Sequence, residues 1–243
     1  PIAPEVLKFF MSIGVPLFEA YGMTENCAYA TSNSPENIKI GTVGIPAHGV
    51  ELKLADDGEI LIRSGGVFKG YFKDDQATSE TIDKDGWLHT GDVGIYEGDF
   101  VKIIDRKRDI IITSGGKNVS PSEIENKIKV SPFIKEAIVI GDRRKFLSVL
   151  IGIEFDTVSN WALRKNIPHT TYRDLSEKQE VKDLVWKEIS KANELTSSLE
   201  VREFRMIPKE LDHEEGELTA TQKVKRNVLI DQFSDLIEEM YSW

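Results

Sequence analysis

The segment from Trp87 to Asp92 ends in an acidic side chain that could bind a sugar. Its residues are Trp, Leu, His, Thr, Gly and Asp, in that order. We interpret Thr90 and Gly91 as a tight turn that places Asp92 at the end of an apolar segment. An ionised carboxylate can accept hydrogen bonds from both hydroxyls of a ribose diol. The alternative is that Asp92 caps a turn, which is a common role of aspartate.

A second polar cluster, Tyr21-Gly22-Met23-Thr24-Glu25, follows a short predicted strand at Pro16 to Ala20. The tyrosine ring could stack on a base, and the glycine lets a backbone approach closely. The threonine hydroxyl could reach a phosphate. The glutamate could hold Mg²⁺, which proteins often bind with one carboxylate together with substrate phosphates. Taken alone, the cluster is better explained as an ordinary exit from a strand with a tyrosine at its edge.

The basic segment Asp105-Arg106-Lys107-Arg108-Asp109 offers a further contact. A guanidinium presents a planar fork of donors, so Arg106 could bind a ribose or a phosphate. The alternative is a solvated basic turn between two strands. That alternative is the preferred interpretation for Lys107 and Arg108.

The segment Thr113-Ser114-Gly115-Gly116-Lys117 is small and flexible enough for a phosphate or a thin ligand arm to cross. It lacks the spacing of a P-loop. A structural tight turn explains it nearly as well.

Lys223 lies in a polar loop that follows the acidic run Glu210 to Glu217 and precedes the last predicted helix. A lysine there could neutralise charge that develops on a forming acyl phosphate. Without further context, the simpler view is that Lys223, Lys225 and Arg226 offset the nearby acidic residues.

The first half of the chain must position these residues mainly with strands and turns. Short apolar runs at Glu51 to Leu54 and Glu59 to Ile62 are joined by Asp-Asp-Gly, which predicts a hairpin. Further strands are predicted at Phe100 to Ile104 and Asp109 to Ile112.

The chain begins inside a helical pattern. Because of this, we expect Pro1 to be a cut and not a natural start. The apolar residues expected on one face of this first helix are Val6, Leu7, Phe10 and Ile13.

After Thr113 the pattern becomes a mixture of helices and strands. Ser120-Pro121-Ser122-Glu123 combines a serine cap, a proline at the first helical position and a capping-box glutamate, which predicts a helix to about Lys129. Strands are predicted at 134–140, 148–153 and 201–206, and helices at 157–165 and 180–194. Helical spacing predicts one final amphipathic helix through Leu229, Phe233, Leu236, Ile237 and Met240.

The change of pattern near Asp105 divides the chain into residues 1–104 and 105–243. Hinges are a few residues at the ends of elements that absorb a backbone change, so we expect a hinge at Asp105.

The composition excludes some partners. The chain has 243 residues with a net charge of -10, which argues against nucleic acid because phosphate backbones are bound by clustered Lys and Arg. The single cysteine, Cys27, cannot form an internal disulfide and fits a reducing compartment. No apolar run is long enough for a transmembrane segment. We expect a cytoplasmic protein, for which peripheral association with a membrane is allowed.

The order of the motifs resembles the adenylate-forming superfamily of acyl-CoA synthetases, amino-acid adenylation domains and luciferases. The motifs are YGMTE, GTVGIPAHGVELKL, GEILIRSGGVFKGYF, GWLHTGD and DRKRDIIITSGGKNVSPSEIE, followed by the late lysine. The long stretch from Phe155 to Glu217 and the pattern from Leu218 to Arg226 are most similar to long-chain fatty acyl-CoA synthetases, including the bubblegum type. The resemblance implies an α+β fold, in which a β-rich remnant of the large adenylation domain precedes a small mobile C-terminal domain.

The resemblance implies roles for the first cluster. Tyr21, Gly22 and Met23 belong to the motif that holds adenine and phosphates. Thr24 would bind phosphate and Glu25 would face Mg²⁺.

It implies further roles along the rest of the chain. Asp92 and Arg106 match the ribose-binding pair, and Asp105 matches the hinge about which the small domain rotates. Lys223 matches the lysine that stabilises the adenylation transition state. The pantetheine arm of CoA would pass Ser114, Gly115 and Gly116.

The implied reaction joins a fatty acid and ATP into acyl-AMP with Mg²⁺, and then transfers the acyl group to CoA. The chain departs from the family at Gln222, where most relatives have glycine, and at Ile112, where some have a lysine for the second step. It also lacks the upstream phosphate loop and most of the acyl pocket, so the chain alone is expected to be inactive. The alternatives are an acyl-AMP ligase that serves a carrier protein and a non-catalytic regulatory relative.

Overall fold

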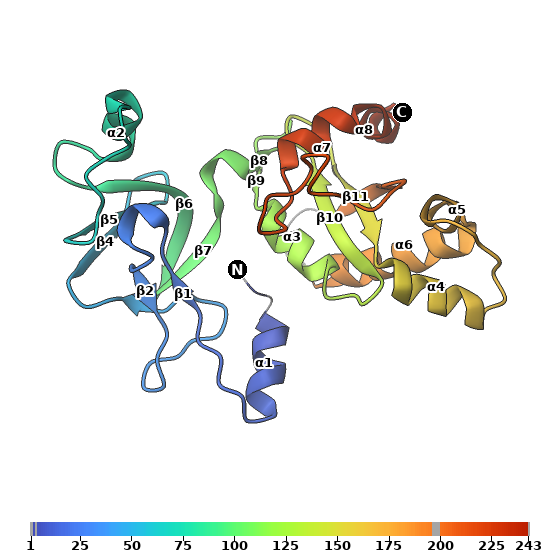
Figure 1. The fold of residues 1–243 in the computed structure, drawn as a ribbon, viewed down its shortest axis with the longest axis horizontal. Helices are drawn as coiled ribbons and strands as arrows, with labels where there is room; N and C mark the ends of the chain where they lie inside the picture. The colour runs from blue at the N-terminus through green and yellow to red at the C-terminus, as the bar shows by residue number, and fades with distance from the viewer. Residues whose placement is uncertain (1, 3, 196–199, 243) are drawn as a thin grey trace. The chain divides into compact units, whose positions relative to one another are not determined.

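The computed structural model describes residues 2, 4–195 and 200–242, and the chain folds into two compact units (Figure 1). The first unit comprises residues 1–110 and the second residues 111–243. Each unit has a hydrophobic core of its own. Pro1, which the sequence suggests is a cut end, lies outside the described residues.

The first unit is built around a four-stranded antiparallel sheet in the order β4-β5-β6-β7. The predicted hairpin is confirmed, because the first two of these strands pair through a turn that contains Gly58 at φ +82°. Ile60, Ile62, Leu88 and Val101 are fully buried at its core. The strands are β4 (Val50–Leu54), β5 (Glu59–Ser64), β6 (Leu88–Glu97) and β7 (Phe100–Arg106).

Short elements complete the first unit. The predicted strand at Pro16 to Ala20 is wrong except for its last residue, because pairing with β2 begins at Ala20. Helix α2 is not among the predicted elements; the carboxylate of Asp74 caps it by accepting the Ala77 N–H. The elements are α1 (Pro4–Ser12), β1 (Ala20–Tyr21), β2 (Thr31–Ser32), β3 (Ile45–Pro46), α2 (Asp75–Thr81) and the 3-10 helices η1 (Thr24–Asn26) and η2 (Lys107–Asp109).

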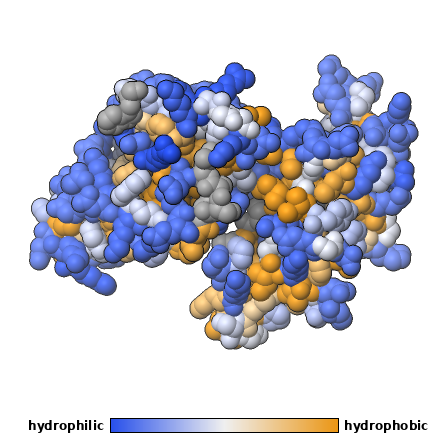
Figure 2. Space-filling view, turned by 180° about the vertical axis from the view of Figure 1, so that it is seen from behind, coloured by the Kyte–Doolittle hydropathy of each residue, from blue (hydrophilic) through white to orange (hydrophobic). Residues whose placement is uncertain are grey.

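The first helix forms as predicted, and it exposes several apolar side chains. Leu7 is the only buried residue of α1, whereas Val6 is 37% exposed and Ile13, beyond the helix end, is 59% exposed. Hydrophobic residues, drawn in orange in Figure 2, reach the molecular surface.

The predicted tight turn in the Trp-Leu-His-Thr-Gly-Asp segment is wrong, because the chain there forms a bulge within β6. Leu61 pairs with His89, whereas Glu59 pairs with Val93, so β6 advances four residues while β5 advances two. Gly91 lies in the bulge at φ +70°, a backbone region that favours glycine. The bulge lengthens one strand locally and leaves its side chains free to point away from the regular ladder.

The second unit contains a three-stranded sheet in the order β10-β11-β12. The first pair of strands is antiparallel and the second is parallel, which requires the helical crossover that follows β11. Two of these strands have the predicted bounds and the third begins one residue earlier than predicted. The elements are β8 (Ile111–Ile112), β9 (Asn118–Val119), β10 (Ile134–Ile140), β11 (Leu147–Ile153), α4 (Phe155–Arg164), α5 (Tyr172–Glu177), α6 (Gln179–Glu194) and β12 (Val201–Met206).

Helices cover both faces of this sheet. On one face, α3 (Pro121–Ile128) and α6 pack in a core with Val149 and Ile151. On the other face, α7 (Arg226–Gln232) and α8 (Ser234–Tyr241) pack with Leu150. Every residue of β11 is buried because both of its faces are covered.

The ends of the helices test two predictions. Ser120 caps α3 as predicted, since its hydroxyl oxygen accepts the Glu123 N–H at 3.3 Å. The single final helix is wrong, because Phe233, at φ -105° and ψ +25°, separates α7 from α8. The apolar stripe itself is confirmed, since Leu229, Phe233, Ile237 and Met240 are all buried.

The predicted α+β class is confirmed, with a strand-rich first unit followed by a mixed second unit. The units divide between Ile110 and Ile111, and Asp105 lies within β7 of the first unit. In the described part of the chain, no helix combines the length and the apolar character needed to cross a membrane.

Candidate functional site

Three residues predicted to bind nucleotide meet in the first unit. The Tyr21 hydroxyl donates to Oδ2 of Asp92 at 2.5 Å, and Nε of Arg106 lies 3.3 Å from Oδ1 of the same carboxylate. Asp92 and Arg106 are direct partners across β6 and β7. The sheet therefore brings together residues that are 71 and 14 positions apart in the sequence.

The Asp92 carboxylate keeps capacity for further hydrogen bonds. A carboxylate offers about four lone-pair sites, of which the Tyr21 hydroxyl takes one, while Arg106 forms an ion pair with Oδ1. Burial, together with the hydrogen bond to Asp92, raises the pKa of Tyr21 well above its ordinary value, so its phenol stays a donor at neutral pH. The Asp92 side chain is only 10% exposed, which favours specific partners over bulk water. The arrangement can accept two adjacent hydroxyls.

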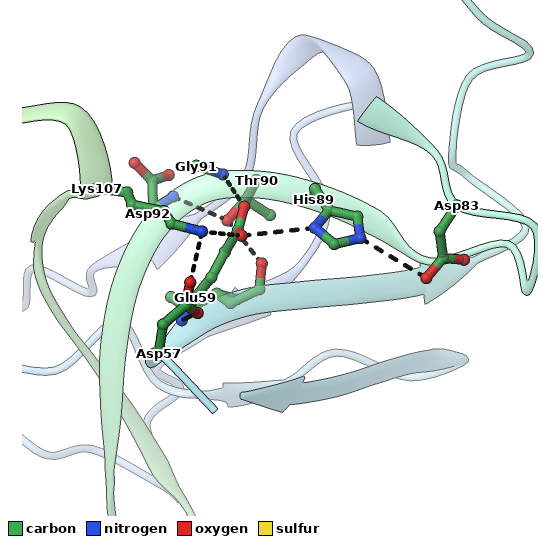
Figure 3. Close-up of polar contacts among 9 residues, drawn as sticks. Asp57, Glu59, Asp83, His89, Thr90, Gly91, Asp92 and Lys107 are labelled. Carbon is green, nitrogen blue, oxygen red and sulfur yellow. Dashed lines mark hydrogen bonds and ion pairs between the residues drawn. The ribbon is translucent and has the colours of Figure 1, made fainter. Parts of the chain in front are cut away.

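The bulge in β6 positions Asp92 (Figure 3). The Gly91 N–H donates to Oε1 of Glu59 at 2.9 Å. The Thr90 hydroxyl donates to the Ile60 carbonyl at 2.8 Å and accepts the Asp92 N–H at 3.1 Å. Contacts with β5 and within β6 thus hold the backbone from Thr90 to Asp92 in place.

Thr24 and Glu25 form the start of η1 in the same unit. The Tyr71 hydroxyl donates to Oε1 of Glu25 at 2.8 Å, and this hydrogen bond raises the pKa of Tyr71. No group of three or more His, Cys, Asp or Glu residues gathers as a metal site among the residues that the structure describes. A lone carboxylate fits Mg²⁺, because this ion is often held by one carboxylate together with waters and phosphates.

Gly22 and Met23 have structural roles that the geometry makes visible. A Cβ at Gly22 would lie 2.2 Å from the Ala28 backbone carbon, so no larger residue fits there. Met23 packs against the core of the first unit. Gly22 thus lets the motif fold back on itself, and contact with a ligand stays a prediction for both residues.

Ser114, Gly115 and Gly116 lie in the turn between β8 and β9 of the second unit. The Gly116 N–H donates to the Thr113 carbonyl at 2.9 Å, and Gly116 has φ +75°. A Cβ at Gly115 would meet only the Thr113 hydroxyl oxygen at 4.0 Å. The turn is therefore open around Gly115, while Gly116 is required by its backbone conformation.

Lys223 lies at the end of a tight turn in the second unit. Leu218 and Val224 form an isolated β-bridge that closes the turn. The Thr219 N–H donates to the Lys223 carbonyl at 2.8 Å, and the Lys223 N–H donates to the Thr219 hydroxyl oxygen at 3.0 Å. The side chain is exposed, and its ammonium forms no ion pair with any described residue. Gln222 adopts φ +60°, a backbone region that favours glycine.

Three residues with visible roles at the site lie outside the predicted set of site residues. Tyr71 contacts Glu25, and Glu59 accepts the Gly91 N–H. Lys107, interpreted as a solvated turn residue, forms ion pairs with Asp57 at 2.6 Å and Glu59 at 3.0 Å. The sequence places Glu59 at the start of a predicted apolar strand. A carboxylate at such a position needs polar partners, and this could have indicated its contacts with other residues.

Two family descriptions match the chain. Residues 1–72 match AMP-binding enzyme, and residues 108–243 match AMP-binding enzyme C-terminal domain. The second match covers more than half of the chain, and the chain belongs to the AMP-binding enzymes, the adenylate-forming superfamily that its motifs resemble.

Among individual proteins, the chain is similar to ligases of long-chain fatty acids. It is 37% identical over 245 residues to long-chain-fatty-acid–CoA ligase FadD15 of Mycobacterium bovis, covering 100% of this chain and 41% of the relative. It is 35% identical over 259 residues to long-chain-fatty-acid–CoA ligase 6 of Homo sapiens, covering 100% and 37%. For long-chain-fatty-acid–CoA ligase ACSBG2 of Gallus gallus, the identity is 32% over 267 residues, with 100% and 35% covered. The chain thus spans 35–41% of the length of these relatives.

Solved structures share the fold. The A domain of a carboxylic acid reductase from Segniliparus rugosus, in complex with AMP and a co-purified carboxylic acid, superposes with a TM-score of 0.76 at 22% identity, covering 100% of this chain and 38% of that one. O-succinylbenzoate coenzyme A synthetase from Bacillus subtilis, in complex with ATP and a magnesium ion, has a TM-score of 0.67 at 27% identity, covering 93% and 44%.

Proposed function

We propose that the chain is part of an ATP-dependent enzyme that converts a long-chain fatty acid to acyl-AMP and then to acyl-CoA, releasing pyrophosphate and AMP. The identity to long-chain fatty-acid CoA ligases over the whole chain supports this substrate class. The chain alone is proposed to be inactive, since it corresponds to less than half of such enzymes.

The Tyr21–Asp92–Arg106 cluster carries the proposal. A nearly buried carboxylate, held between a phenol and a guanidinium and with lone-pair sites remaining, suits a ribose diol. Arg106 adds a fixed positive charge beside the nucleotide. Tyr21 would orient the carboxylate and, through its ring, border the base.

The remaining predicted residues divide the other tasks. Thr24 would bind phosphate, and Glu25, fixed by Tyr71, would hold Mg²⁺. When bound, Mg²⁺ neutralises phosphate charge and orients the phosphate oxygens. Lys223 would stabilise the charge that develops during adenylation, because a positioned cation acts most strongly where charge appears in the transition state.

The second half-reaction needs a different arrangement of the two units. We propose that Asp105 is the hinge, and that Ser114, Gly115 and Gly116 border the path of the pantetheine arm. The absence of any neighbour closer than 4.0 Å around a Cβ at Gly115 is consistent with such a path.

The test is ATP binding by the full-length enzyme and its Asp92→Ala variant, measured by calorimetry without fatty acid. The loss of two charge-assisted hydrogen bonds should weaken ATP about 100-fold. Binding of inorganic pyrophosphate should stay unchanged, since it has no ribose. An unchanged ATP affinity would remove the ribose role of Asp92.

The product assay separates the alternatives. With fatty acid, ATP and Mg²⁺, the proposed enzyme releases pyrophosphate, and added CoA yields acyl-CoA and AMP. An acyl-AMP ligase would release pyrophosphate and form no acyl-CoA. A non-catalytic relative would release none.

A further inference from the structure

Glu59 is a buried carboxylate beside the candidate ribose site. Its side chain is 8% exposed, and it lies at the first residue of β5, next to the bulge in β6. An unpaired charge at such a position would be strongly destabilising, so its partners show what it does.

The partners of Glu59 are the chain neighbours of the two residues that flank the ribose site. Oε1 accepts the N–H of Gly91, which precedes Asp92, at 2.9 Å. Oε2 accepts a hydrogen bond from Nζ of Lys107, which follows Arg106, at 3.0 Å. One carboxylate thus contacts β6 just before Asp92 and η2 just after Arg106, as Figure 3 shows for Gly91 and Lys107.

Further contacts fix the orientation of this carboxylate. Oε2 also lies 3.5 Å from Nδ1 of His89, whose Nε2 lies 3.7 Å from Asp83. Lys107 forms a second ion pair with Asp57, in the turn before β5, at 2.6 Å. Burial raises the pKa of Glu59, but hydrogen bonds from Lys107 and Gly91 outweigh burial, so the net pKa is below its ordinary value and the group is an anion at neutral pH.

We propose that Glu59 is a positioning residue for ribose recognition: it sets the spacing between Asp92 and Arg106 by binding the Gly91 N–H and the Lys107 ammonium together. This inference rests on the proposed ribose role of Asp92. Glu59 itself touches no nucleotide; it acts through the backbone of the bulge and through the residue after Arg106. A neutral side chain with one acceptor oxygen can no longer bind both donors and loses the ion pair with Lys107, so the carboxylate and the guanidinium can move apart.

The test uses Glu59→Gln in the full-length enzyme and measures the dissociation constants of ATP and of 3′-deoxy-ATP. Glutamine keeps the size of the side chain but removes the anion. We expect ATP to bind about tenfold more weakly and 3′-deoxy-ATP to change by less than about threefold, so discrimination between the two nucleotides falls. A loss of equal size for both nucleotides means general loosening and overturns the proposal.

A double-mutant cycle with Asp92→Ala tests whether Glu59 acts through Asp92. In the Asp92→Ala background, Glu59→Gln should change ATP affinity by less than about twofold. Additive losses overturn the proposal while leaving the ribose role of Asp92 intact. If Asp92→Ala alone leaves ATP affinity unchanged, the ribose role of Asp92 fails, and this inference fails with it.

Two variants guard against misfolding and against nonspecific charge effects. Lys107→Met removes the ammonium that pairs with Glu59, and the protein should fold because the Lys107 side chain is 48% exposed. This variant should lower the discrimination between ATP and 3′-deoxy-ATP, as Glu59→Gln does. Unchanged nucleotide discrimination in Lys107→Met contradicts a role of Glu59 that depends on both Gly91 and Lys107. Glu51→Gln is the matched control, because this exposed carboxylate on β4 pairs with Arg63 and should leave discrimination as in wild type.

Discussion

Replacing Lys223 with alanine should slow the adenylation half-reaction far more than thioester formation. A lysine ammonium that neutralises developing charge acts in one chemical step, so its loss should appear in that step alone. Thioester formation from supplied acyl-AMP and CoA should keep nearly its wild-type rate.

The structure sets the magnitude of this effect. The Lys223 side chain is exposed and forms no ion pair with any residue in the described ranges, so alanine leaves no acidic partner unpaired. The backbone contacts between Lys223 and Thr219 do not depend on the side chain. We therefore expect stability to change by less than about 0.5 kcal/mol. Removing a charge-stabilising donor costs about 10²–10³-fold in rate.

The assay is single-turnover kinetics of the full-length enzyme in two formats. Pyrophosphate release from fatty acid and ATP reports adenylation, and acyl-CoA formation from added acyl-AMP reports the second step. Lys225→Ala is the matched control, because Lys225 is also exposed and its backbone alone binds the Glu217 carbonyl at 2.8 Å and the Leu229 N–H at 3.3 Å.

Equal losses in the two half-reactions would refute the reasoning, since a structural defect of the loop would affect both steps. A loss in Lys225→Ala as large as in Lys223→Ala would equally refute it, because the effect would then belong to the net charge of the loop.

Three further predictions concern stability. Gln222→Gly should raise the unfolding free energy by up to about 1 kcal/mol, since φ +60° strains a residue with a side chain, while Gln222→Val should lower it; thermal melting of the full-length protein measures both. Arg226→Met should destabilise the protein by about 1–3 kcal/mol, because it removes the 2.5 Å ion pair with Glu125 and the 2.8 Å hydrogen bond to the Val139 carbonyl. Arg143→Met is the control and should have almost no effect, since this side chain is 93% exposed. The folded state lowers the pKa of Glu59 below its unfolded value, near 4.5, so the stability that its charge contributes is present above that value and is lost as pH falls through the folded pKa. The difference in melting temperature between wild type and Glu59→Gln should therefore shrink over that pH range.

Elements with strong local signals could be predicted from the sequence. The cap at Ser120 and the proline after it predicted the start of α3, and the predicted bounds of β10 and β12 match those of the structure. These signals depend on neighbours in sequence, which is why they needed no knowledge of the fold. The order of motifs likewise predicted the family to which the chain belongs.

The bulge in β6 and the contacts of Glu59 could not be predicted in the same way. The two extra residues become visible only when β6 is aligned against β5, some 30 positions earlier in the chain. The break at Phe233 has a similar origin, because the apolar stripe continues through it and only the backbone at that residue shows the interruption. Long-range pairing decided these features, and short windows of sequence do not report it.

The bulge in β6 has a consequence for the lengths of insertions and deletions that this strand can tolerate. Side chains in a strand alternate between faces, so losing one residue between His89 and Asp92 would turn Asp92 to the opposite face of the sheet. Losing two residues would restore the alternation and give a regular strand, but the N–H that binds Glu59 would be lost. The spacing from His89 to Asp92 should therefore resist deletion of either length, even where the neighbouring loops vary.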